Sequence, residues 1–275
     1  MLNLLRKPLH ATLKRFGMEL RSIVIHEQAD NPYHALSYLL LAQETHTILD
    51  AGASIGDTSQ LLANLFPNAN VHAIEPNPPF FEQLEDLARI NPRIHAHRLA
   101  LSNQDGTATL RINQSEGTNS LLSTSPHRED PYGDLLATTK ETDVQTKTLD
   151  TFLDLNEIEQ VDLLKLDLQG SELDAIQGAS GALEKGIVRA ILCEVLFAKS
   201  YENQPTPTAL LHQLVEEHSF TLFNLYQPHY HRGRLLQADA LLLHSSLLPL
   251  ARERTSAAFH AHSHLPLTCT PNLTQ

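Results

Sequence analysis

Hydrophobic and polar positions alternate along this chain in a strand and helix order. Short apolar runs at 47–50, 71–74 and 94–101 predict buried strands. Leucines spaced by three and four after Asp57, and a similar stripe over 80–90, predict amphipathic helices between those strands. Consecutive strands joined by helices connect through right-handed crossovers, so the pattern predicts a parallel sheet with helices packed on it.

The second half of the chain continues this order. Apolar runs at 161–167 and 190–194 predict two more core strands, and the stretch 107–149 predicts a hairpin with a long polar loop. Strands expected at 221–226 and 238–244 lie too close in sequence for a helical crossover, so they should pair antiparallel. The expected fold is a doubly wound α/β domain with a seven-stranded sheet, mostly parallel with one antiparallel strand.

Both ends of the chain depart from this order. Apolar residues from Leu2 to Leu20, spaced by three and four among basic residues, predict a basic amphipathic helix within residues 1–29. That helix suits contact with an anionic membrane surface, whereas packing on its own domain or a partner subunit is the commoner use. Residues 30–250 then form the main domain, and residues 251–275 are expected to be a disordered tail because they lack apolar periodicity.

Composition narrows the class of protein. A chain of 275 residues that is 41% hydrophobic can bury a full core, and its formal charge of -12 argues against nucleic acid as the main partner. Cys193 lies in an apolar run, where a free buried thiol is expected, which favours a reducing, cytoplasmic compartment. No apolar run reaches the length of a membrane-spanning helix, and Pro8, Lys14 and Arg15 interrupt what a signal peptide would keep apolar.

The polar residues that follow the strands carry the candidate chemistry, because ligands of open α/β sheets bind beyond the carboxyl ends of the strands. The first strand ends in a loop from Asp50 to Gly56, in which Gly52 and Gly56 allow close approach of the backbone to a ligand. The second strand ends at Glu75, whose carboxylate can accept both hydroxyls of a ribose. This pairing suits either a nicotinamide dinucleotide or S-adenosylmethionine.

The loop itself weighs against the dinucleotide. A dinucleotide site would need glycines where this loop has Ser54 and Asp57, and the acidic Asp57 would repel a pyrophosphate. S-adenosylmethionine has no phosphate, so its amino acid end can use the glycine turn while Glu75 holds its ribose. An NAD-dependent oxidoreductase and a cofactor-binding scaffold without activity stay open as alternatives.

Four motifs follow one another along the chain: Asp50 to Gly56, Glu75-Pro76-Asn77, Thr148-Leu149-Asp150 and the segment from Leu164 to Glu172. A weaker fifth match is Asn119-Ser120-Leu121. With these motifs the sequence resembles an FkbM-type methyltransferase, a branch of the class I S-adenosylmethionine-dependent enzymes with a Rossmann-like fold. The resemblance covers roughly residues 46–245 and implies O-methylation of a hydroxyl on a sugar, glycan or small natural product.

The resemblance also implies roles for single residues. It places Asp50 and Gly52 near the methionine end of the cofactor, Glu75 at the ribose and Asp167 beside the sulfonium. Further candidates for contact with the cofactor are Ser54, Gly56 and Pro76, and candidates for contact with the substrate are Asn119, Ser120, Glu172 and His231.

A general base is the remaining question, because methyl transfer to a hydroxyl releases a proton. Glu194 ends the apolar strand 190–194, where an unpaired carboxylate would be costly, and Asp167 ends the preceding core strand, 161–167. His229 and His231 lie in the expected loop 227–232 on the ligand side of the sheet. The sequence leaves open whether Glu194, His229 or Asp167 acts. Pairs of His-x-His occur, but two ligands do not complete a metal site, and we expect none.

Overall fold

The computed structural model describes residues 18–22, 31–127, 131–251, 253 and 267–271. The chain divides into two units, of which one comprises residues 1–39 and 250–275 and the other residues 40–249. Within the described residues, none of the helices has the length and apolar character that crossing a membrane requires.

The described residues of the first unit include helix α3 and a two-stranded sheet. Helix α3 spans Pro32–Leu39, and strand β1 (Met18–Ser22) pairs antiparallel with β12 (Leu267–Pro271). The helix predicted within residues 1–29 is therefore wrong at 18–22, and residues 1–17 lie outside the described residues. The disorder predicted for the tail is wrong at β12. Both differences have one cause, since each strand takes its backbone partner from the opposite end of the chain.

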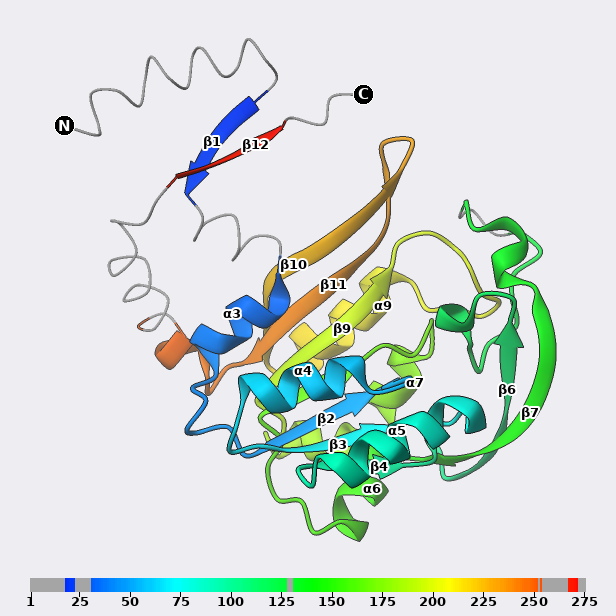
Figure 1. Ribbon diagram of the computed structural model, residues 1–275, viewed down its shortest axis with the longest axis horizontal. Coiled ribbons are helices and arrows are strands. Elements are labelled where there is room, and N and C mark those ends of the chain that lie inside the picture. The colour runs from blue at the N-terminus through cyan, green and yellow to red at the C-terminus, as the bar shows by residue number, and fades with distance from the viewer. Residues whose placement is uncertain (1–17, 23–30, 128–130, 252, 254–266, 272–275) are drawn as a thin grey trace. The chain divides into compact units, whose positions relative to one another are not determined.

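The second unit is built on a seven-stranded sheet with the order β10-β11-β9-β8-β2-β3-β4 (Figure 1). Strand β11 pairs antiparallel with both its neighbours, and the remaining pairs are parallel. One strand thus opposes six others, which confirms the predicted α/β Rossmann-like fold. The strands are β2 (Thr47–Ala51), β3 (Asn70–Ile74), β4 (Ile94–His97), β8 (Leu163–Leu166), β9 (Ala190–Leu196), β10 (Phe220–His231) and β11 (Arg234–His244).

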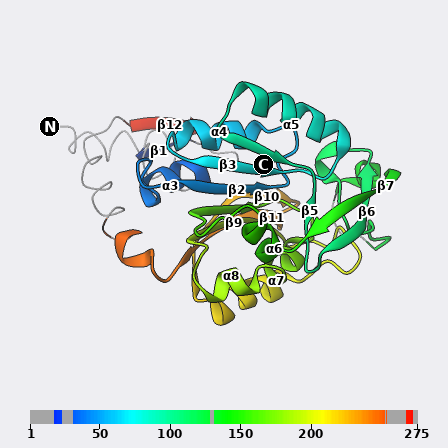
Figure 2. The same cartoon turned by 90° about the horizontal axis from the view of Figure 1, so that it is seen from below.

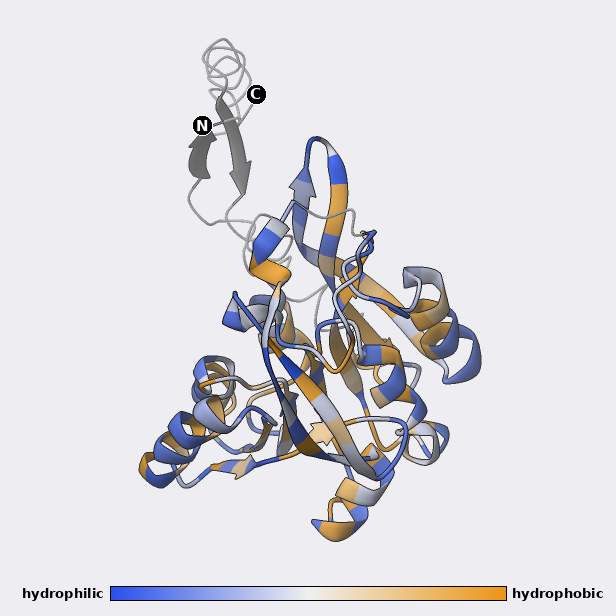
Figure 3. Cartoon of the chain, turned by 90° about the vertical axis from the view of Figure 1, so that its right-hand side faces the viewer, coloured by the Kyte–Doolittle hydropathy of each residue, from blue (hydrophilic) through white to orange (hydrophobic). Residues whose placement is uncertain are grey.

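Helices cover both faces of this sheet. Figure 2 shows α4 and α5 on one face and α6, α7 and α8 on the other. Hydrophobic residues are concentrated on the central strands, whereas the helices carry mixed faces (Figure 3). The helices are α4 (Asp57–Leu65), α5 (Pro78–Ile90), α6 (Leu149–Leu155), α7 (Glu172–Gln177), α8 (Ser180–Glu184) and α9 (Pro207–His212), which continues as a π-turn over Gln213–Glu217.

Helix α6 begins within the motif Thr148-Leu149-Asp150, at Leu149, the residue at which the predicted hairpin was expected to end. The Thr148 side chain accepts the Thr151 N–H and caps α6. Both oxygens of Asp150 accept N–H groups at the start of α8, from Gly181 and Ala182, at 2.8 Å each. The motif therefore stabilises the beginnings of two helices.

A second sheet lies beyond the carboxyl ends of the parallel strands (Figure 1). It has the order β5-β7-β6, where β6 (Gly106–Asn113) and β7 (Thr138–Lys147) form the predicted hairpin. The strand predicted at 94–101 is divided, because β5 (Ala100–Leu101) leaves the main sheet and pairs with β7. The loop of the hairpin contains two short 3-10 turns, Glu116–Thr118 and Gly133–Leu136.

The β10–β11 hairpin is longer than the sequence indicated. Residues 227–231, predicted as part of a loop, continue β10 with bulges between Tyr226 and Tyr230. The chain reverses through Arg232 and Gly233, which both have positive φ, of 48° and 79°. Two-residue turns of this kind match the twist of paired strands and extend the ladder to the turn.

Candidate active site

The loop after β2 is tied to the end of β3 by its backbone. The N–H groups of Gly52 and Ala53 donate to the Ile74 carbonyl at 3.0 and 3.1 Å. Gly52 has a φ of 78°, and a Cβ added there would lie 1.9 Å from the Asp167 carbonyl oxygen. Only glycine fits this position, so Gly52 lets the ends of β2, β3 and β8 converge.

Glu75 is held at this convergence by two backbone donors. Its Oε2 accepts the Ser54 N–H and its Oε1 accepts the Asn77 N–H, both at 2.8 Å. Glu75 is only 6% exposed. Burial raises the pKa of its carboxyl to about 7, although the two backbone hydrogen bonds act to lower it. Each carboxylate oxygen accepts one backbone hydrogen, which leaves capacity on both for a ligand.

Asp50 lies beneath the loop and is fully buried. Its Oδ2 accepts the Ser59 hydroxyl at 2.6 Å, and its Oδ1 lies 3.3 Å from the Lys165 ammonium. Lys165 also lies 3.5 Å from Oδ2 of Asp167. Asp50 thus supports the loop from behind and is not among the residues that line the cavity described next.

A cavity of about 140 Å³ opens at the ends of β2, β3 and β8. Its lining combines apolar side chains with carboxyl, amide and hydroxyl groups. Of the candidates proposed from the sequence, Gly52, Ser54, Glu75, Pro76, Asn119, Ser120 and Asp167 line it. Gly56 does not, because it faces Leu84 and Leu87 of α5. The other lining residues include Phe80, Leu99, Leu101, Leu110, Gly117, Gln169 and Ser171.

Two buried polar atoms in this wall have no hydrogen-bond partner. The Asn119 side chain accepts the Asn113 N–H through Oδ1 at 2.9 Å, while its Nδ2 is buried without a partner. The hydroxyl of Ser171, a residue only 2% exposed, is likewise unpartnered. Unpaired buried polar groups are costly, so both atoms indicate that the cavity receives a polar ligand.

The turn after β8 presents Gln169 between two acidic strand ends. Glu172 holds this turn from inside, since its carboxylate accepts the Leu168 N–H at 2.8 Å and the Gly170 N–H at 3.0 Å. The Gln169 Nε2 donates to Asp167 Oδ1 and to Glu194 Oε2, each at 2.9 Å. Glu172 thus lies behind the turn, and Gln169 is the residue that faces the cavity.

Glu194 is the centre of a hydrogen-bond network. Its second oxygen accepts the Gln237 amide at 2.9 Å, and the Tyr132 hydroxyl donates to Gln237 Oε1 at 3.1 Å. The same hydroxyl lies 3.2 Å from His229 Nδ1. His229 is exposed on β10 and reaches Glu194 only through these two residues.

The carboxylates at these strand ends raise each other's pKa. Burial, followed by the negative charges of Asp167, Glu172 and Asp239, raises the pKa of Glu194 well above its usual value, and Lys165 opposes this. Burial raises the pKa of Glu172 to about 7 and that of Asp239 to about 6. The acidic cluster therefore favours a positively charged ligand.

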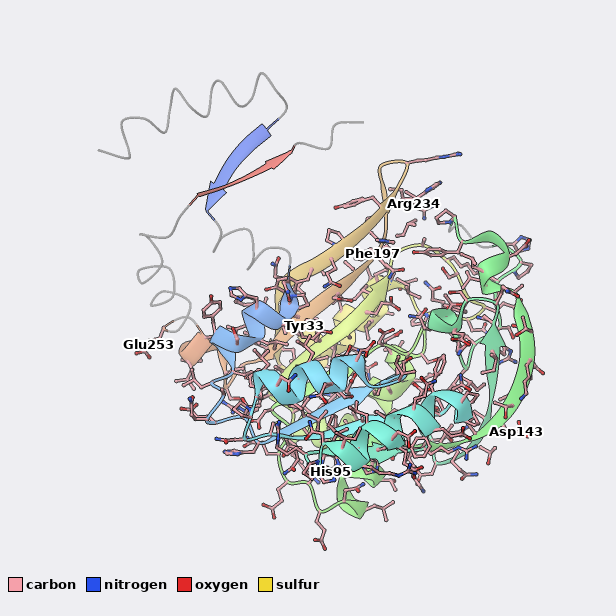
Figure 4. All side chains as sticks on the ribbon, viewed as in Figure 1. Tyr33, His95, Asp143, Phe197, Arg234 and Glu253 are labelled. Atoms are coloured by element: carbon pink, nitrogen blue, oxygen red, sulfur yellow. The ribbon has the colours of Figure 1, made fainter. Side chains whose placement is uncertain are left out.

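His231 lies apart from this cluster. It pairs with Arg234 beside the turn of the β10–β11 hairpin, and Figure 4 shows Arg234 at that end of the hairpin. It is exposed and does not line the cavity. In the described part of the chain, no group of three or more histidine, cysteine, aspartate or glutamate side chains is arranged to hold a metal ion.

Sequence reasoning did not single out Gln169, Tyr132, Tyr201 or Gln237. Gln169 stands inside the motif from Leu164 to Glu172, so its position was visible but not its role. The Tyr201 hydroxyl donates to Gln169 Oε1 at 3.1 Å from a loop after β9. Gln237 reaches Glu194 only because of the antiparallel register of β11 and β9, and local pattern does not encode that register.

Comparison with known proteins finds relatives that are named as methyltransferases. The chain is 28% identical over 142 residues to Methyltransferase 1 of Beauveria bassiana, covering 48% of this chain and 57% of that protein. It is 26% identical over 177 residues to the 2-O-methyltransferase NoeI of Sinorhizobium fredii, covering 62% and 72%. It is 24% identical over 155 residues to the hexuronic acid methyltransferase AglP of Haloferax volcanii, covering 56% and 57%. The match thus spans little more than half the length of the first and third of these relatives.

A family profile described as the methyltransferase FkbM domain matches residues 50–222, which is more than half of the chain. The matched segment begins at Asp50 and includes Glu75, Asp167 and Glu194. The chain therefore belongs to the FkbM methyltransferase domain family.

Proposed function

We propose that this protein is an S-adenosylmethionine-dependent O-methyltransferase that methylates a hydroxyl of a sugar, glycan or small natural product. The observation that carries the proposal is Glu75, a buried carboxylate fixed by the Ser54 and Asn77 amides in the wall of a cavity. The names of two relatives support the acceptor class, since one is a 2-O-methyltransferase and the other a hexuronic acid methyltransferase.

The residues of the cavity fit this cofactor. Glu75 would accept the two ribose hydroxyls, and the apolar wall that includes Phe80, Leu99 and Leu101 would cover the adenine. The unpartnered Asn119 Nδ2 and Ser171 hydroxyl would supply polar contacts. When bound, the cofactor supplies a methyl carbon on a sulfonium, which is open to in-line displacement.

The charges of the site support the same assignment. Asp167 lines the cavity, and the acidic cluster around it favours a sulfonium and an ammonium over phosphates. Asp57, in the first turn of α4, would repel the pyrophosphate of a dinucleotide. The cofactor proposed here is therefore preferred to NAD on electrostatic grounds.

We assign the role of general base to Glu194, with Asp167 and His229 as alternatives. Glu194 is buried among carboxylates, and its raised pKa keeps its proton affinity high enough to accept a proton from a hydroxyl. Gln169 and Gln237 orient its two oxygens. His229 is separated from Glu194 by Gln237 and Tyr132, so in this proposal it supports the network from outside.

Two measurements test the function. Titration calorimetry should give binding of S-adenosylhomocysteine and little binding of NADH, and the reverse result would contradict the proposal in favour of an oxidoreductase. Methyl-labelled cofactor, incubated with the protein and a glycan extract of its own cells, should label an acceptor. Binding without any labelling would favour a scaffold that holds the cofactor but has no activity.

Single substitutions then separate base from bystander. Glu194→Gln keeps both amide contacts in part and removes the proton acceptor, so turnover at saturating cofactor should fall by about 100-fold or more. His229→Ala should reduce turnover by less than about fivefold, because a surface interaction is lost. Glu184→Gln, on the exposed face of α8, is the matched control. If all three variants turn over equally, catalysis rests on alignment of the reactants alone.

A reducing, cytoplasmic compartment is part of the proposal. It is supported by the thiol of Cys193, which is free and fully buried, and whose pKa burial raises far above its usual value. Contact of residues 1–17 with a membrane surface stays a prediction.

A further inference from the structure

A second cavity, of about 190 Å³, lies beside the first and shares Gly117 and Gln169 with it. The shared wall places Gln169 between the proposed cofactor site and this second cavity. Its lining is mostly polar, and we call it the polar cavity. The lining residues are Ser115, Gly117, Thr118, Tyr132, Leu136, Gln169, Glu194, Leu196, Ser200, Tyr201 and Gln237.

The side chains of the polar cavity match hydroxyl groups. The amides of Gln169 and Gln237 carry both donors and acceptors, as a hydroxyl does. Tyr132 and Tyr201 add two phenolic hydroxyls and two aromatic rings, and aromatic rings suit the C–H surface of a sugar. The cavity therefore offers paired polar contacts and apolar faces to one ring-shaped ligand.

The charges of the polar cavity are all of one sign. Its described lining residues include Glu194 but no lysine, arginine or histidine. Asp239 lies opposite Glu194 where strands β11 and β9 pair. Asp167 and Glu194 both accept a hydrogen bond from the Gln169 side-chain amide. Lys165 lies 3.3 Å from Asp50 and 3.5 Å from Asp167, and the His229 ring lies 3.2 Å from the Tyr132 hydroxyl. A ligand carboxylate would therefore meet carboxyl groups, and the described lining offers it no lysine or arginine as a partner.

We propose that the polar cavity is the acceptor subsite and that it takes an uncharged, hydroxyl-bearing ring, such as a neutral pyranose, and rejects hexuronic acids and sugar phosphates. This proposal rests on the function proposed above, and it chooses between two acceptor classes that the function leaves open. Rejection comes from like charges brought together in a buried site, which is an effective means of discrimination between similar ligands.

Matched acceptors test the choice. The methyl glycosides of glucose, galactose and mannose are compared with their uronates, as panels, with methyl-labelled cofactor at saturation. Saturation-transfer NMR of the same panels, with S-adenosylhomocysteine present, reports binding whether or not a ring is methylated. We expect the neutral panel to be favoured by at least about tenfold in either readout. Equal or better use of the uronates overturns the proposal, as does absence of neutral-ring binding to a protein that binds S-adenosylhomocysteine.

A cation placed in the cavity should weaken the preference for neutral rings. Ser115 lines the polar cavity, and its side chain makes no capping hydrogen bond, so Ser115→Lys adds a charge without removing a helix cap. The variant should narrow the discrimination against uronates by about tenfold, whereas Ser245→Lys, at an exposed turn, should not. Equal behaviour of the two variants overturns the charge argument. If the wild-type protein does not bind S-adenosylhomocysteine, the proposed function itself fails, which is a separate result.

Discussion

Replacement of Glu75 by alanine is the most direct test of the cofactor site. Two ribose hydroxyls would use the capacity that the backbone bonds leave on the carboxylate. Hydrogen bonds to a charged group contribute about 1.5 to 3 kcal/mol each. Their joint loss corresponds to about 3 to 6 kcal/mol, so Glu75→Ala should weaken binding of S-adenosylhomocysteine by about two to four powers of ten.

The pH dependence of ligand affinity gives a second expected magnitude for Glu75. Because the pKa of Glu75 is raised to about 7, the ligand-free carboxyl is half protonated at that pH. A ligand that binds only the ionised form should lose about tenfold in affinity between pH 8 and pH 6. Glu75→Gln cannot titrate, so the part of the pH dependence due to Glu75 should be absent from it. This comparison separates Glu75 from Glu172, whose pKa is also about 7.

Titration calorimetry at pH 6, 7 and 8 measures both effects. Glu82→Ala, which removes an exposed carboxylate from α5, is the control for the change in net charge. Thermal denaturation without ligand shows how far each Glu75 variant is folded, since the Ser54 and Asn77 N–H groups lose their acceptor in Glu75→Ala. A folded Glu75→Ala protein with unchanged affinity and unchanged pH dependence would refute the ribose assignment.

Three further substitutions probe the loop, the histidines and the turn. Gly52→Ala forces a Cβ against the Asp167 carbonyl, so it should lower the free energy of unfolding by about 2 to 4 kcal/mol in urea denaturation, and an unchanged value would contradict the close approach. Burial lowers the pKa of His72 and His97 to about 4, so their contribution to stability is present above pH 6.5 and is lost as the pH falls towards 4. After allowance for their partial exposure this amounts to about 1 kcal/mol each between pH 7 and pH 5, and His97→Phe should show a smaller loss than the wild type. Gln169→Ala should reduce turnover by about tenfold or more, because Asp167 and Glu194 lose the amide that they share, and it should weaken binding of S-adenosylhomocysteine by much less; an equal loss in both would indicate a merely structural role.

The fold was predictable because its main signals are local. Each core strand is a short apolar run that ends in a polar residue, and such ends meet at one edge of a parallel sheet. Gly52, Glu75 and Asp167 were found in this way, and all three line one cavity. The single antiparallel strand was predicted from the short connection between the last two strands, because that connection is too short for a helical crossover.

The parts that escaped prediction depend on distant partners. Asp50 and Glu172 lie in motifs, yet both turn inward, one to Lys165 and the other to backbone N–H groups of its own turn. A motif reports that a residue type is needed, and it does not report on which side of the loop the side chain lies. Tyr132 and Tyr201 come from irregular segments without any period, so only the folded structure brings them to Gln169 and Gln237.

The buried carboxylates connect the stability of the fold with the proposed activity. A carboxyl whose pKa is raised on folding stabilises the protein below its unfolded pKa and loses that contribution as the pH rises through the folded value. In the ligand-free protein, ionised Glu194 and Asp239 side chains therefore lower the stability of the fold at neutral pH, because burial and neighbouring negative charges disfavour their ionisation. A positive charge beside Asp167 would lower the pKa of Glu194 and favour its ionised form. In the proposed enzyme, the base would thus become ionised when a cationic cofactor is present, and the same cluster would select against an anionic acceptor.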